Sequence, residues 1–389
     1  MRIAIVGAGV LGLSVARELA GNGDQVTVYE ADRPGAGTSG TTFAWVNSHT
    51  KEPTGYHELN VAGVRAHHAR IAGGSGAPFG FHPSGTLEWA ETAEHDRALR
   101  SAVDRLRRRD YPAELIDARH ARALEPGARG LDSARSVAVF ASEGYVLPAE
   151  FLGTLLTDAL ARGVRLVCPV RVRELGTTSG AARIALDDGS TAEADIVISA
   201  VGRWTGELAA TAGCSVPMAH PDGPATAGYL AYTDPVPARL ARPLTTSWLN
   251  VRPDGGGRLV LQALDFDTEA DAGAPAPGPD SAMARELRER LAAVLVGGEY
   301  ARIAEVRVGQ RALPADGLTV CGFADDHRRL YVVTTHSGVT LAPALAPMVA
   351  GEVRTGTPAA MLAEFRPGRF TAGERSAGGS SGTGNPGRQ

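Results

Sequence analysis

The sequence predicts an α/β fold, α+β overall, in which a domain built on a parallel sheet is joined to a second domain built on an antiparallel sheet. The first 30 residues support this prediction because they have the pattern strand, glycine-rich turn, helix, strand. Residues 228–263 contain period-2 apolar runs separated by turn residues, which is typical of antiparallel strands. The length of 389 residues favours two domains over one.

The first 30 residues form the best-defined unit. Residues 2–6 are expected to form a buried parallel strand, helical spacing of apolar residues predicts a helix over 13–20, and residues 25–29 predict a second strand. The glycine motif GAGVLG occupies residues 7–12, and Glu30 follows the second strand. This arrangement is Rossmann-like and predicts dinucleotide binding.

The glycines and the acidic residue each have a physical task in such a unit. Gly7 makes the tight turn, Gly9 lets a pyrophosphate approach the backbone, and Gly12 lets the helix pack close to the strand. The helix N-terminus offers free N–H groups and a positive dipole end to phosphates, and Glu30 can accept hydrogen bonds from a ribose diol. A signal peptide is disfavoured by the glycines and by the strand that resumes at residue 25.

The remaining elements are expected in order along the chain. The loop 34–42, rich in glycine and hydroxyl side chains, is expected to wrap the rest of a long cofactor, and the Gly/Ser-rich tail 371–389 is expected to be disordered. The periodicities predict helices over 55–72, 93–109, 117–124, 148–162 and 282–295, with two more opening after 204 and at 336–340. They predict strands over 85–90, 137–141, 164–172, 183–186, 190–192, 195–201, 228–233, 246–252, 258–263, 305–311 and 330–335.

Composition excludes several classes of function. The net charge of −4 gives no electrostatic footprint for nucleic acid, and no apolar run is long enough to span a bilayer. Cys168, Cys214 and Cys321 are scattered and odd in number, which predicts no disulfide framework, no metal site and a reducing cytoplasm. The chain has a single lysine, Lys51, whose retention reflects either chance or a chemical need, since a buried lysine readily loses its proton.

Four separated motifs, which together span residues 2 to about 350, point to one family. They are GAGVLG with Glu30, the loop 38–43 (TSGTTF), the strand end 195–205 (DIVISAVGRWT), and the segments 311–317 (RALPADG) and 331–343 (YVVTTHSGVTLAP). In combination they resemble the FAD-dependent D-amino-acid oxidase family, which includes glycine and sarcosine oxidases. The resemblance implies FAD as the cofactor and a Rossmann-like FAD-binding domain beside an antiparallel-sheet substrate domain.

The resemblance also implies domain boundaries and cofactor contacts. The FAD-binding domain is expected to comprise residues 1–50, 140–215 and 305–370, and the substrate domain residues 51–139 and 216–304. The residues expected to bind FAD are Gly7, Ala8, Gly9, Val10, Leu11, Gly12, Glu30, Ala31, Arg33, Thr38, Ser39, Gly40, Thr41, Thr42, Val172, Ala200, Gly202, Trp204, Arg311, Ser337, Gly338, Val339 and Thr340.

Two features refine the expected FAD site. The N–H groups of residues 338–340 lie where a helix follows a strand, so they would stabilise negative charge at the N1–C2=O locus of the reduced flavin; the alternative is an ordinary helix cap at Ser337. Monomeric sarcosine oxidases tether FAD through a cysteine, but Cys321 lies several residues too late. The tryptophan–histidine pair of the histidyl-FAD enzymes is absent after Thr42. These departures predict non-covalent FAD.

Five residues are candidates for the substrate site. Arg311 matches the family's Gly-x-Arg motif, whose arginine clamps the substrate carboxylate; a surface salt bridge is the alternative. His336 and Trp248 fall near the positions of a second carboxylate contact and a pocket aromatic. His49 and Lys51 follow the flavin-facing loop and are candidates to face the substrate. For these four residues a purely structural role is the alternative.

The resemblance implies oxidation of the C–N bond of a D-amino acid, glycine or sarcosine, or a cyclic imino acid. Hydride would pass from Cα to flavin N5 and give an imine that water hydrolyses, and no side chain need act as a base if the amine arrives neutral. Lys51 is not where the sarcosine enzymes keep their oxygen-activating lysine, so O2, a quinone or another electron carrier remains open as the acceptor.

Two other functions fit parts of the sequence. An aromatic-ring flavin monooxygenase shares the GxGxxG start, and residues 322–327 (GFADDH) faintly match its G-D-A-x-H motif. Consumption of NADPH would identify that class. A non-catalytic flavin-binding subunit is the third possibility, and it would hold FAD that no amine reduces. An NAD-dependent dehydrogenase is disfavoured because the C-terminal motifs would have no role in it.

Overall fold

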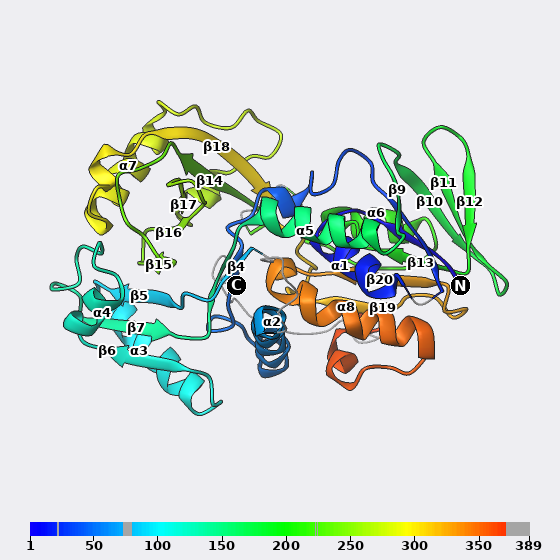
Figure 1. Ribbon diagram of the computed structural model, residues 1–389, viewed down its shortest axis with the longest axis horizontal. Coiled ribbons are helices and arrows are strands. Elements are labelled where there is room, and N and C mark those ends of the chain that lie inside the picture. Colours follow the sequence, from blue (N-terminus) through cyan, green and yellow to red (C-terminus); the bar gives the residue numbers. More distant parts are fainter. Residues whose placement is uncertain (22, 73–79, 222, 224, 371–389) are drawn as a thin grey trace, which may run out of the picture.

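The chain forms two lobes that lie side by side (Figure 1). The computed structural model describes residues 1–21, 23–72, 80–221, 223 and 225–370, so the predicted disorder of the tail 371–389 lies outside the described residues. The first lobe contains a six-stranded sheet and the second lobe an eight-stranded sheet. Both predicted sheet types are therefore present.

The six-stranded sheet of the first lobe is parallel except for the pair β19–β20. The odd and even residues of its central strand face different cores: Ile3 and Ile5 pack under the helices, while Ala4 and Val6 pack on the opposite face. This layered arrangement confirms the Rossmann-like prediction. The strand order is β19 (Val320–Phe323), β20 (Leu330–Thr334), β13 (Ile196–Ser199), β1 (Arg2–Val6), β2 (Gln25–Tyr29) and β9 (Arg165–Val167).

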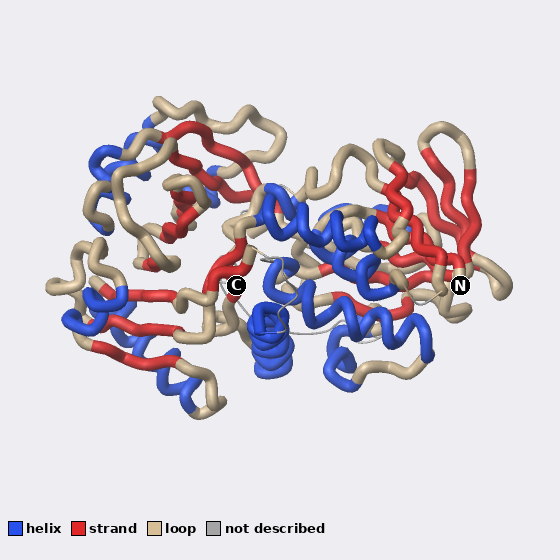
Figure 2. The backbone as a smooth tube through the Cα atoms, in the orientation of Figure 1, coloured by secondary structure: helices blue, strands red, loops and turns tan. Residues whose placement is uncertain are grey.

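Helices cover one face of this sheet and a smaller sheet covers the other. In Figure 2 the smaller sheet projects from the end of the first lobe that is remote from the second lobe. Helices α1 (Val10–Leu19), α5 (Pro148–Ala161) and α8 (Gly338–Thr355) form the helical layer, and α2 (Thr54–Ala72) packs on α8. The opposite face carries α6 (Thr205–Ala210) and the sheet of β10 (Val172–Thr177), β11 (Ala182–Leu186) and β12 (Thr191–Ala194).

The eight-stranded sheet of the second lobe is antiparallel except for the pair β15–β5. Its order is β18 (Ile303–Gln310), β14 (Ala227–Thr233), β17 (Leu259–Gln262), β16 (Asn250–Pro253), β15 (Leu244–Thr245), β5 (Thr86–Ala90), β7 (Ser136–Phe140) and β6 (Ala113–Ile116). Helices α3 (Ala93–Arg107), α4 (Ala118–Leu124) and α7 (Ala282–Val294) pack on it. A short sheet of β3 (Trp45–Val46), β8 (Gly144–Val146) and β4 (Phe81–His82) connects the lobes.

Two predicted strands are wrong in their bounds. The strand predicted over 164–172 ends at Val167, because Pro169 has no N–H to continue the ladder. The strand predicted over 246–252 is correct only for residues 250–252, which belong to β16. Residues 246–249 form a turn between β15 and β16, because the Thr246 hydroxyl accepts the N–H groups of Trp248 and Leu249 and so competes with strand pairing. The strands that were not predicted are β3, β4, β6, β8, β10, β15 and β19.

The predicted domain division remains a proposal, and two elements cross it. Strand β18 pairs with β14 in the second lobe, although residues from 305 onward were assigned to the FAD-binding domain. Helix α2 packs on α8 of the first lobe, where a Cβ on Gly63 would lie 2.4 Å from the carbonyl oxygen of Thr340.

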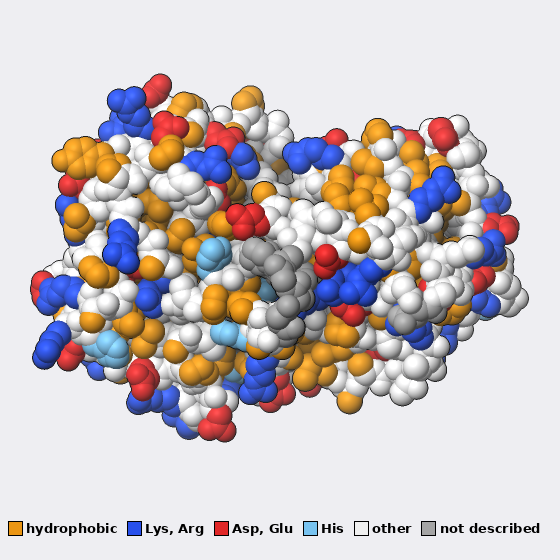
Figure 3. Space-filling model, in the orientation of Figure 1, with side chains coloured by type: hydrophobic (Ala, Val, Ile, Leu, Met, Phe, Trp, Pro, Cys, Tyr) orange, Lys and Arg blue, Asp and Glu red, His pale blue; other side chains and the backbone are white. Residues whose placement is uncertain are grey.

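Among the described residues, none of the helices combines the length and apolarity needed to cross a bilayer. On the face shown in Figure 3, acidic and basic side chains alternate across both lobes.

Candidate active site

A cavity of about 540 Å³ lies where the two lobes meet. Its first-lobe wall comes from the segment 38–51 and from the start of α8, and its second-lobe wall comes from β5, α3 and the sheet β14–β17. All five residues predicted for the substrate site line this cavity: His49, Lys51, Trp248, Arg311 and His336. The structure thus brings these residues together, and their individual roles toward a substrate stay predictions.

The turn between β1 and α1 has the close packing that the glycine motif predicts. Gly7 adopts a φ of +101°, and a Cβ on it would lie 2.6 Å from the carbonyl oxygen of Ala200. A Cβ on Gly12 would lie 1.9 Å from the carbonyl oxygen of Gly7. No residue larger than glycine fits at either position without displacing backbone.

The N-terminus of α1 is buried and lacks internal acceptors. Ser39 Oγ accepts the Val10 N–H at 3.1 Å, whereas no described residue accepts the N–H groups of Leu11 and Gly12. Buried helix N–H groups need a partner, and the helix dipole favours an anionic one. This terminus therefore fits the pyrophosphate of a dinucleotide.

The N-terminus of α8 has the same property. The first of its N–H groups with an acceptor is that of Leu341, which donates to Ser337 O at 2.9 Å; no described residue accepts the N–H groups of residues 338–340. A Cβ on Gly338 would lie 3.4 Å from Val10 Cγ2, so the N-termini of α1 and α8 are adjacent. Two such termini side by side fit a ligand with two acceptor groups, as the pyrophosphate and the flavin carbonyls of FAD would provide.

Glu30 lies at the end of β2 and holds the adjoining turns. Its Oε2 accepts the Ala8 N–H at 2.8 Å and its Oε1 accepts the Asp32 N–H at 3.0 Å. Each carboxylate oxygen keeps a further lone pair, so the carboxylate can still accept from a ribose hydroxyl.

The other residues predicted to bind FAD extend from this turn to the cavity. Trp204 is 39% exposed and lies against Gly37, where an added Cβ would be 3.3 Å from its ring. Gly9 lies next to Ser39, and Gly40 ends a short 3₁₀ turn. Ala31 and Arg33 come directly after Glu30, and Arg33 is exposed. Val172 begins β10, and Ala200 and Gly202 follow the end of β13. Thr38, Thr41, Thr42, Ser337, Val339 and Thr340 line the cavity.

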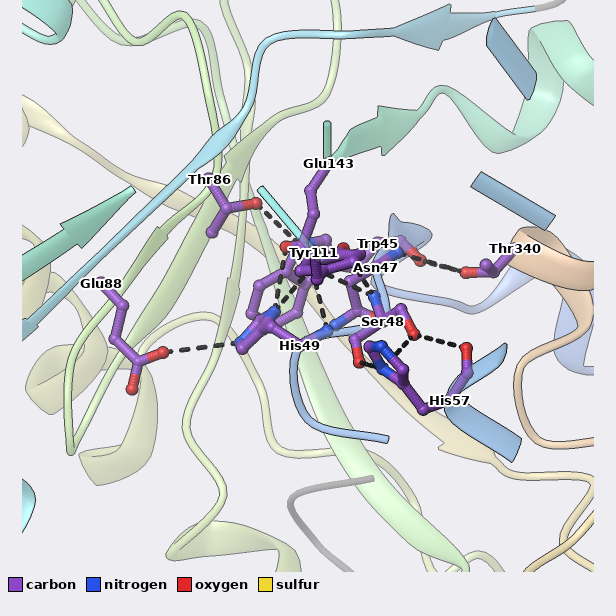
Figure 4. A network of polar contacts seen from close by, with 10 residues as sticks. All are labelled: Trp45, Asn47, Ser48, His49, His57, Thr86, Glu88, Tyr111, Glu143 and Thr340. Atoms are coloured by element: carbon purple, nitrogen blue, oxygen red, sulfur yellow. Dashed lines mark hydrogen bonds and ion pairs between the residues drawn. The ribbon is translucent and has the colours of Figure 1, made fainter. Parts of the chain in front are cut away.

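The segment 38–51, which runs from the predicted FAD-binding loop into the cavity, is held by hydrogen bonds to both lobes. Thr340 Oγ1, in the first turn of α8, donates to Trp45 O at 3.1 Å and accepts the Asn47 N–H at 3.4 Å. Trp45 Nε1 donates to Thr86 Oγ1 of β5 at 2.9 Å. Figure 4 shows these contacts, through which the segment is tied to α8 and to the second lobe.

His49 is held by a buried carboxylate that the sequence did not indicate. Its Nδ1 lies 2.8 Å from Glu143 Oε1, and this oxygen also accepts the backbone N–H groups of Ser48 and His49 at 3.1 Å and the Tyr111 hydroxyl at 2.6 Å (Figure 4). The imidazole stacks on Phe140 with ring centroids 4.0 Å apart. Only 4% of His49 is exposed.

The second imidazole nitrogen of His49 faces another carboxylate. Its Nε2 lies 3.5 Å from Glu88 Oε2, while His95 Nε2 lies 2.8 Å from Glu88 Oε1. Burial acts to lower the pKa of His49, but Glu143 and Glu88 outweigh it and raise the pKa to about 9. Burial acts to raise the pKa of Glu88, but the two histidines outweigh it and lower the pKa to about 2. His49 is therefore an imidazolium between two carboxylates at neutral pH.

Lys51 and His336 lie together in the cavity wall. Burial lowers the pKa of Lys51 to about 8, against the opposing effect of Glu143. Burial, with the charges of Lys51 and Arg311, lowers the pKa of His336 well below its ordinary value. His336 is therefore a neutral hydrogen-bonding group, while the pKa of Lys51 lies near physiological pH.

Arg311 is partly occupied by a second acidic residue that the sequence did not indicate. Its Nη1 donates to the carbonyl oxygens of Ala225 and Ala227 at 3.1 and 2.9 Å, and its Nη2 donates to Asp267. Burial raises the pKa of Asp267 against the effect of Arg311. Three of the five guanidinium N–H donors are thus engaged among the described residues, and two remain for a substrate carboxylate.

Trp248 lies in the turn between β15 and β16 rather than within a strand. Its Nε1 donates to Glu91, and its backbone oxygen accepts from Arg290 Nη1 at 2.7 Å. These contacts fix the half-buried indole in the second-lobe wall of the cavity, where it can serve as the predicted pocket aromatic.

The raised pKa of His49 predicts a pH dependence of stability. His49 holds a proton in the folded protein up to about pH 9 but loses it in the unfolded chain above about 6.5, so the free energy of unfolding falls as pH rises between these values. Above about pH 8, Lys51 has the opposite effect: it loses its proton in the folded protein before it does so in the unfolded chain, so its contribution to the free energy of unfolding rises with pH. Between pH 6.5 and 8, the His49→Gln variant should lack a slope of about 1.4 kcal/mol per pH unit, as measured by urea unfolding. Equal slopes in both proteins would contradict the charged state of His49.

Comparisons with known proteins agree with this geometry. The profile of the FAD-dependent oxidoreductase family DAO matches residues 2–351. Glycine oxidase from Bacillus licheniformis is 25% identical over 364 residues, which cover 89% of this chain and 91% of that protein.

Solved structures share the fold. The crystal structure of glycine oxidase from Geobacillus kaustophilus has a TM-score of 0.80 at 22% identity, with 94% of this chain and 98% of that chain covered. Iminodiacetate oxidase from Chelativorans sp. BNC1 has a TM-score of 0.78 at 22% identity, with 94% and 99% covered. The resemblance inferred from the sequence is thereby confirmed, and the chain belongs to the DAO family of FAD-dependent oxidoreductases.

Proposed function

We propose that this protein oxidises the C–N bond of an amino acid or a secondary amine. The observation that supports this most directly is the cavity in which Arg311, Lys51 and His336 meet the uncapped N-terminus of α8. Such a site offers donors for a substrate carboxylate beside the place for a flavin ring. The names of the similar proteins, glycine oxidase and iminodiacetate oxidase, point to the same substrate class.

The residues of the chain have separate tasks in this proposal. The N-termini of α1 and α8 hold FAD, which when bound supplies a two-electron acceptor for the hydride from the substrate Cα. Arg311, kept in place by Asp267, binds the substrate carboxylate with its remaining donors. Trp248 forms part of the second-lobe wall of the cavity.

We propose that FAD is held without a covalent bond and that the protein works in the cytoplasm. None of the three cysteines lines the cavity, and Cys321 is buried in β19, where burial raises its pKa to about 12. A thiol of this kind is a poor nucleophile for flavin attachment. All three cysteines are unpaired, as expected in a reducing compartment. Either O2 or a quinone or other carrier takes the electrons from the flavin.

Anaerobic reduction of the bound flavin tests the proposed reaction. Purified holoprotein is mixed without oxygen with D-, L-, N-methyl and cyclic amino acids, glycine and iminodiacetate. We expect one class to bleach the flavin band at about 450 nm. Admission of air then distinguishes an oxidase, whose colour returns at once, from a dehydrogenase that needs a carrier.

Bound flavin that no amine bleaches would contradict the proposal, and NADPH would be the next reductant. The flavin monooxygenase alternative has little support from the fold, because residues 322–327 form the end of β19 and part of its connection to β20 and open no helix.

A further inference from the structure

An amine that enters the cavity as an ammonium ion can be oxidised only after a group in the cavity has accepted its proton. Amino acids and secondary amines carry an ammonium group at neutral pH, whereas hydride can leave Cα only when the nitrogen lone pair is free. The proton on the substrate nitrogen must therefore move to another group before the oxidation. The cavity presents a small number of titratable groups that can be considered one by one.

His49 and Glu88 are unsuited to receive this proton. His49 is already protonated, and both of its ring nitrogens face carboxylates, Nδ1 toward Glu143 at 2.8 Å and Nε2 toward Glu88 at 3.5 Å. Glu88 is the partner of His49 and His95, and its pKa of about 2 makes it too weak a base. Glu143 is fully buried and accepts four hydrogen bonds at one oxygen.

The two remaining histidines are also poor candidates. His336 lies near the positive charges of Lys51 and Arg311, which oppose its protonation. His95 lines the cavity from the start of α3, in the second lobe, and its Nε2 is bound to Glu88 at 2.8 Å. It is thus part of the second-lobe wall rather than of the group around the N-terminus of α8.

Lys51 is the remaining candidate for the proton acceptor. It is 4% exposed and lines the cavity, and no described residue forms a hydrogen bond with its Nζ. Its backbone N–H donates to Ser48 O at 3.1 Å, which places the residue at the end of the segment that the Glu143 carboxylate anchors. The charge that acts on it is that of the Glu143 carboxylate, which favours the ammonium form; the neighbouring His336 stays neutral.

We propose that the Lys51 amine accepts the proton from the substrate ammonium and so prepares the neutral amine for oxidation. The N–H bond of the substrate breaks, an N–H bond forms on Nζ, and the substrate lone pair is released; no electrons are transferred in this step. The negative charge of Glu143 favours the resulting Lys51 ammonium and opposes the effect of its burial. The proposal rests on the proposed amine oxidation and replaces the sequence-based expectation that no base is needed.

The pH dependence of anaerobic flavin reduction tests the proposal in the holoenzyme. In the wild type, the rate constant of flavin reduction, measured at substrate concentrations well below saturation, should rise with pH and level off at about pH 8, the pKa of Lys51. Lys51→Met should reduce the rate at pH 7 by at least about a hundredfold, and its rate should keep rising up to the pKa of the free substrate amine. Lys51→Arg keeps the positive charge but cannot accept a proton, so it should behave as Lys51→Met does.

A spectroscopic readout uses the fact that the chain has a single lysine. Holoenzyme produced in cells fed with lysine labelled by ¹³C at Cε gives one side-chain lysine signal in an NMR spectrum. The dependence of its chemical shift on pH therefore reports the Lys51 pKa directly. We expect a midpoint at about 8, against about 10.4 for an exposed lysine. The Lys51→Arg spectrum lacks the signal and confirms its origin.

The outcomes separate the two proposals. If amines bleach the wild-type flavin but Lys51→Arg keeps the wild-type rate and pH profile, Lys51 acts only as a cation, and the inference is overturned while the proposed function stands. The inference is also overturned if the midpoint of the lysine signal lies near pH 10.4. It is likewise overturned if the rate profile still levels off at about pH 8 in Lys51→Met but no longer does so in His95→Gln. If no amine bleaches the wild type, both proposals are overturned. FAD content and thermal unfolding of each variant show that the fold is retained.

Discussion

The Gly12→Ala variant is expected to be purified without flavin. The added Cβ would lie 1.9 Å from the carbonyl oxygen of Gly7, and this atom belongs to the backbone turn that carries the N–H groups for the pyrophosphate. Helix α1 must therefore move away from β1, which misplaces the donors of its first turn. We expect FAD affinity to fall by more than about a hundredfold, or about 2.7 kcal/mol, in a titration followed by flavin fluorescence.

A matched glycine in another helix serves as the control. Gly153 lies in α5, and a Cβ on it would meet no heavy atom within 4 Å. Gly153→Ala should retain the full flavin content, and its thermal stability should be unchanged or slightly higher, because alanine favours helix. Wild-type FAD affinity in Gly12→Ala would refute the assignment of this turn to the cofactor.

The Glu143→Leu variant is expected to lose about 3–5 kcal/mol of unfolding free energy, because it removes the closer of the two carboxylates that neutralise the buried His49 imidazolium. It also leaves the hydroxyl of Tyr111 and the backbone N–H groups of Ser48 and His49 without an acceptor. Urea unfolding at pH 7 measures this loss. We also expect weaker substrate binding, since the affected segment leads to Lys51.

Two further variants serve as controls for the result at Glu143. Glu143→Gln keeps the shape and one oxygen acceptor, so it should lose less stability than Glu143→Leu. Glu114 is exposed on β6, and Glu114→Leu should change the unfolding free energy by no more than about 0.5 kcal/mol. A loss in Glu143→Leu as small as that in Glu114→Leu would show that the Glu143 network does not stabilise the fold.

The sequence predicted those parts of the molecule whose signal is local. The glycine motif, the flanking strands and Glu30 lie within 30 residues, and each has a fixed stereochemical task, so their placement followed from spacing alone. Helices such as α2 and α7 were found with bounds correct to within about two residues, as hydrophobic periodicity allows.

The acidic residues of the site had no such signal. Glu143 lies 94 positions from His49 in the sequence, within a turn after β7 that looks like an ordinary surface loop. Asp267 lies 44 positions before Arg311 and in a short 3₁₀ turn. Both become partners only when the sheets fold, so their roles depend on tertiary contacts that spacing does not encode. The one useful clue was chemical: buried cations require counter-ions.

The two walls of the cavity differ in how freely they can be altered by directed evolution. The first-lobe wall consists of the segment 38–51 and the start of α8, which are joined through Thr340, so we expect a mutation there to change the proposed cofactor and substrate contacts together. In the second-lobe wall, no hydrogen bond found among the described residues joins Trp248, Gln262 or Leu264 to α1 or α8. A library restricted to those three positions would vary substrate preference while leaving the cofactor cradle intact.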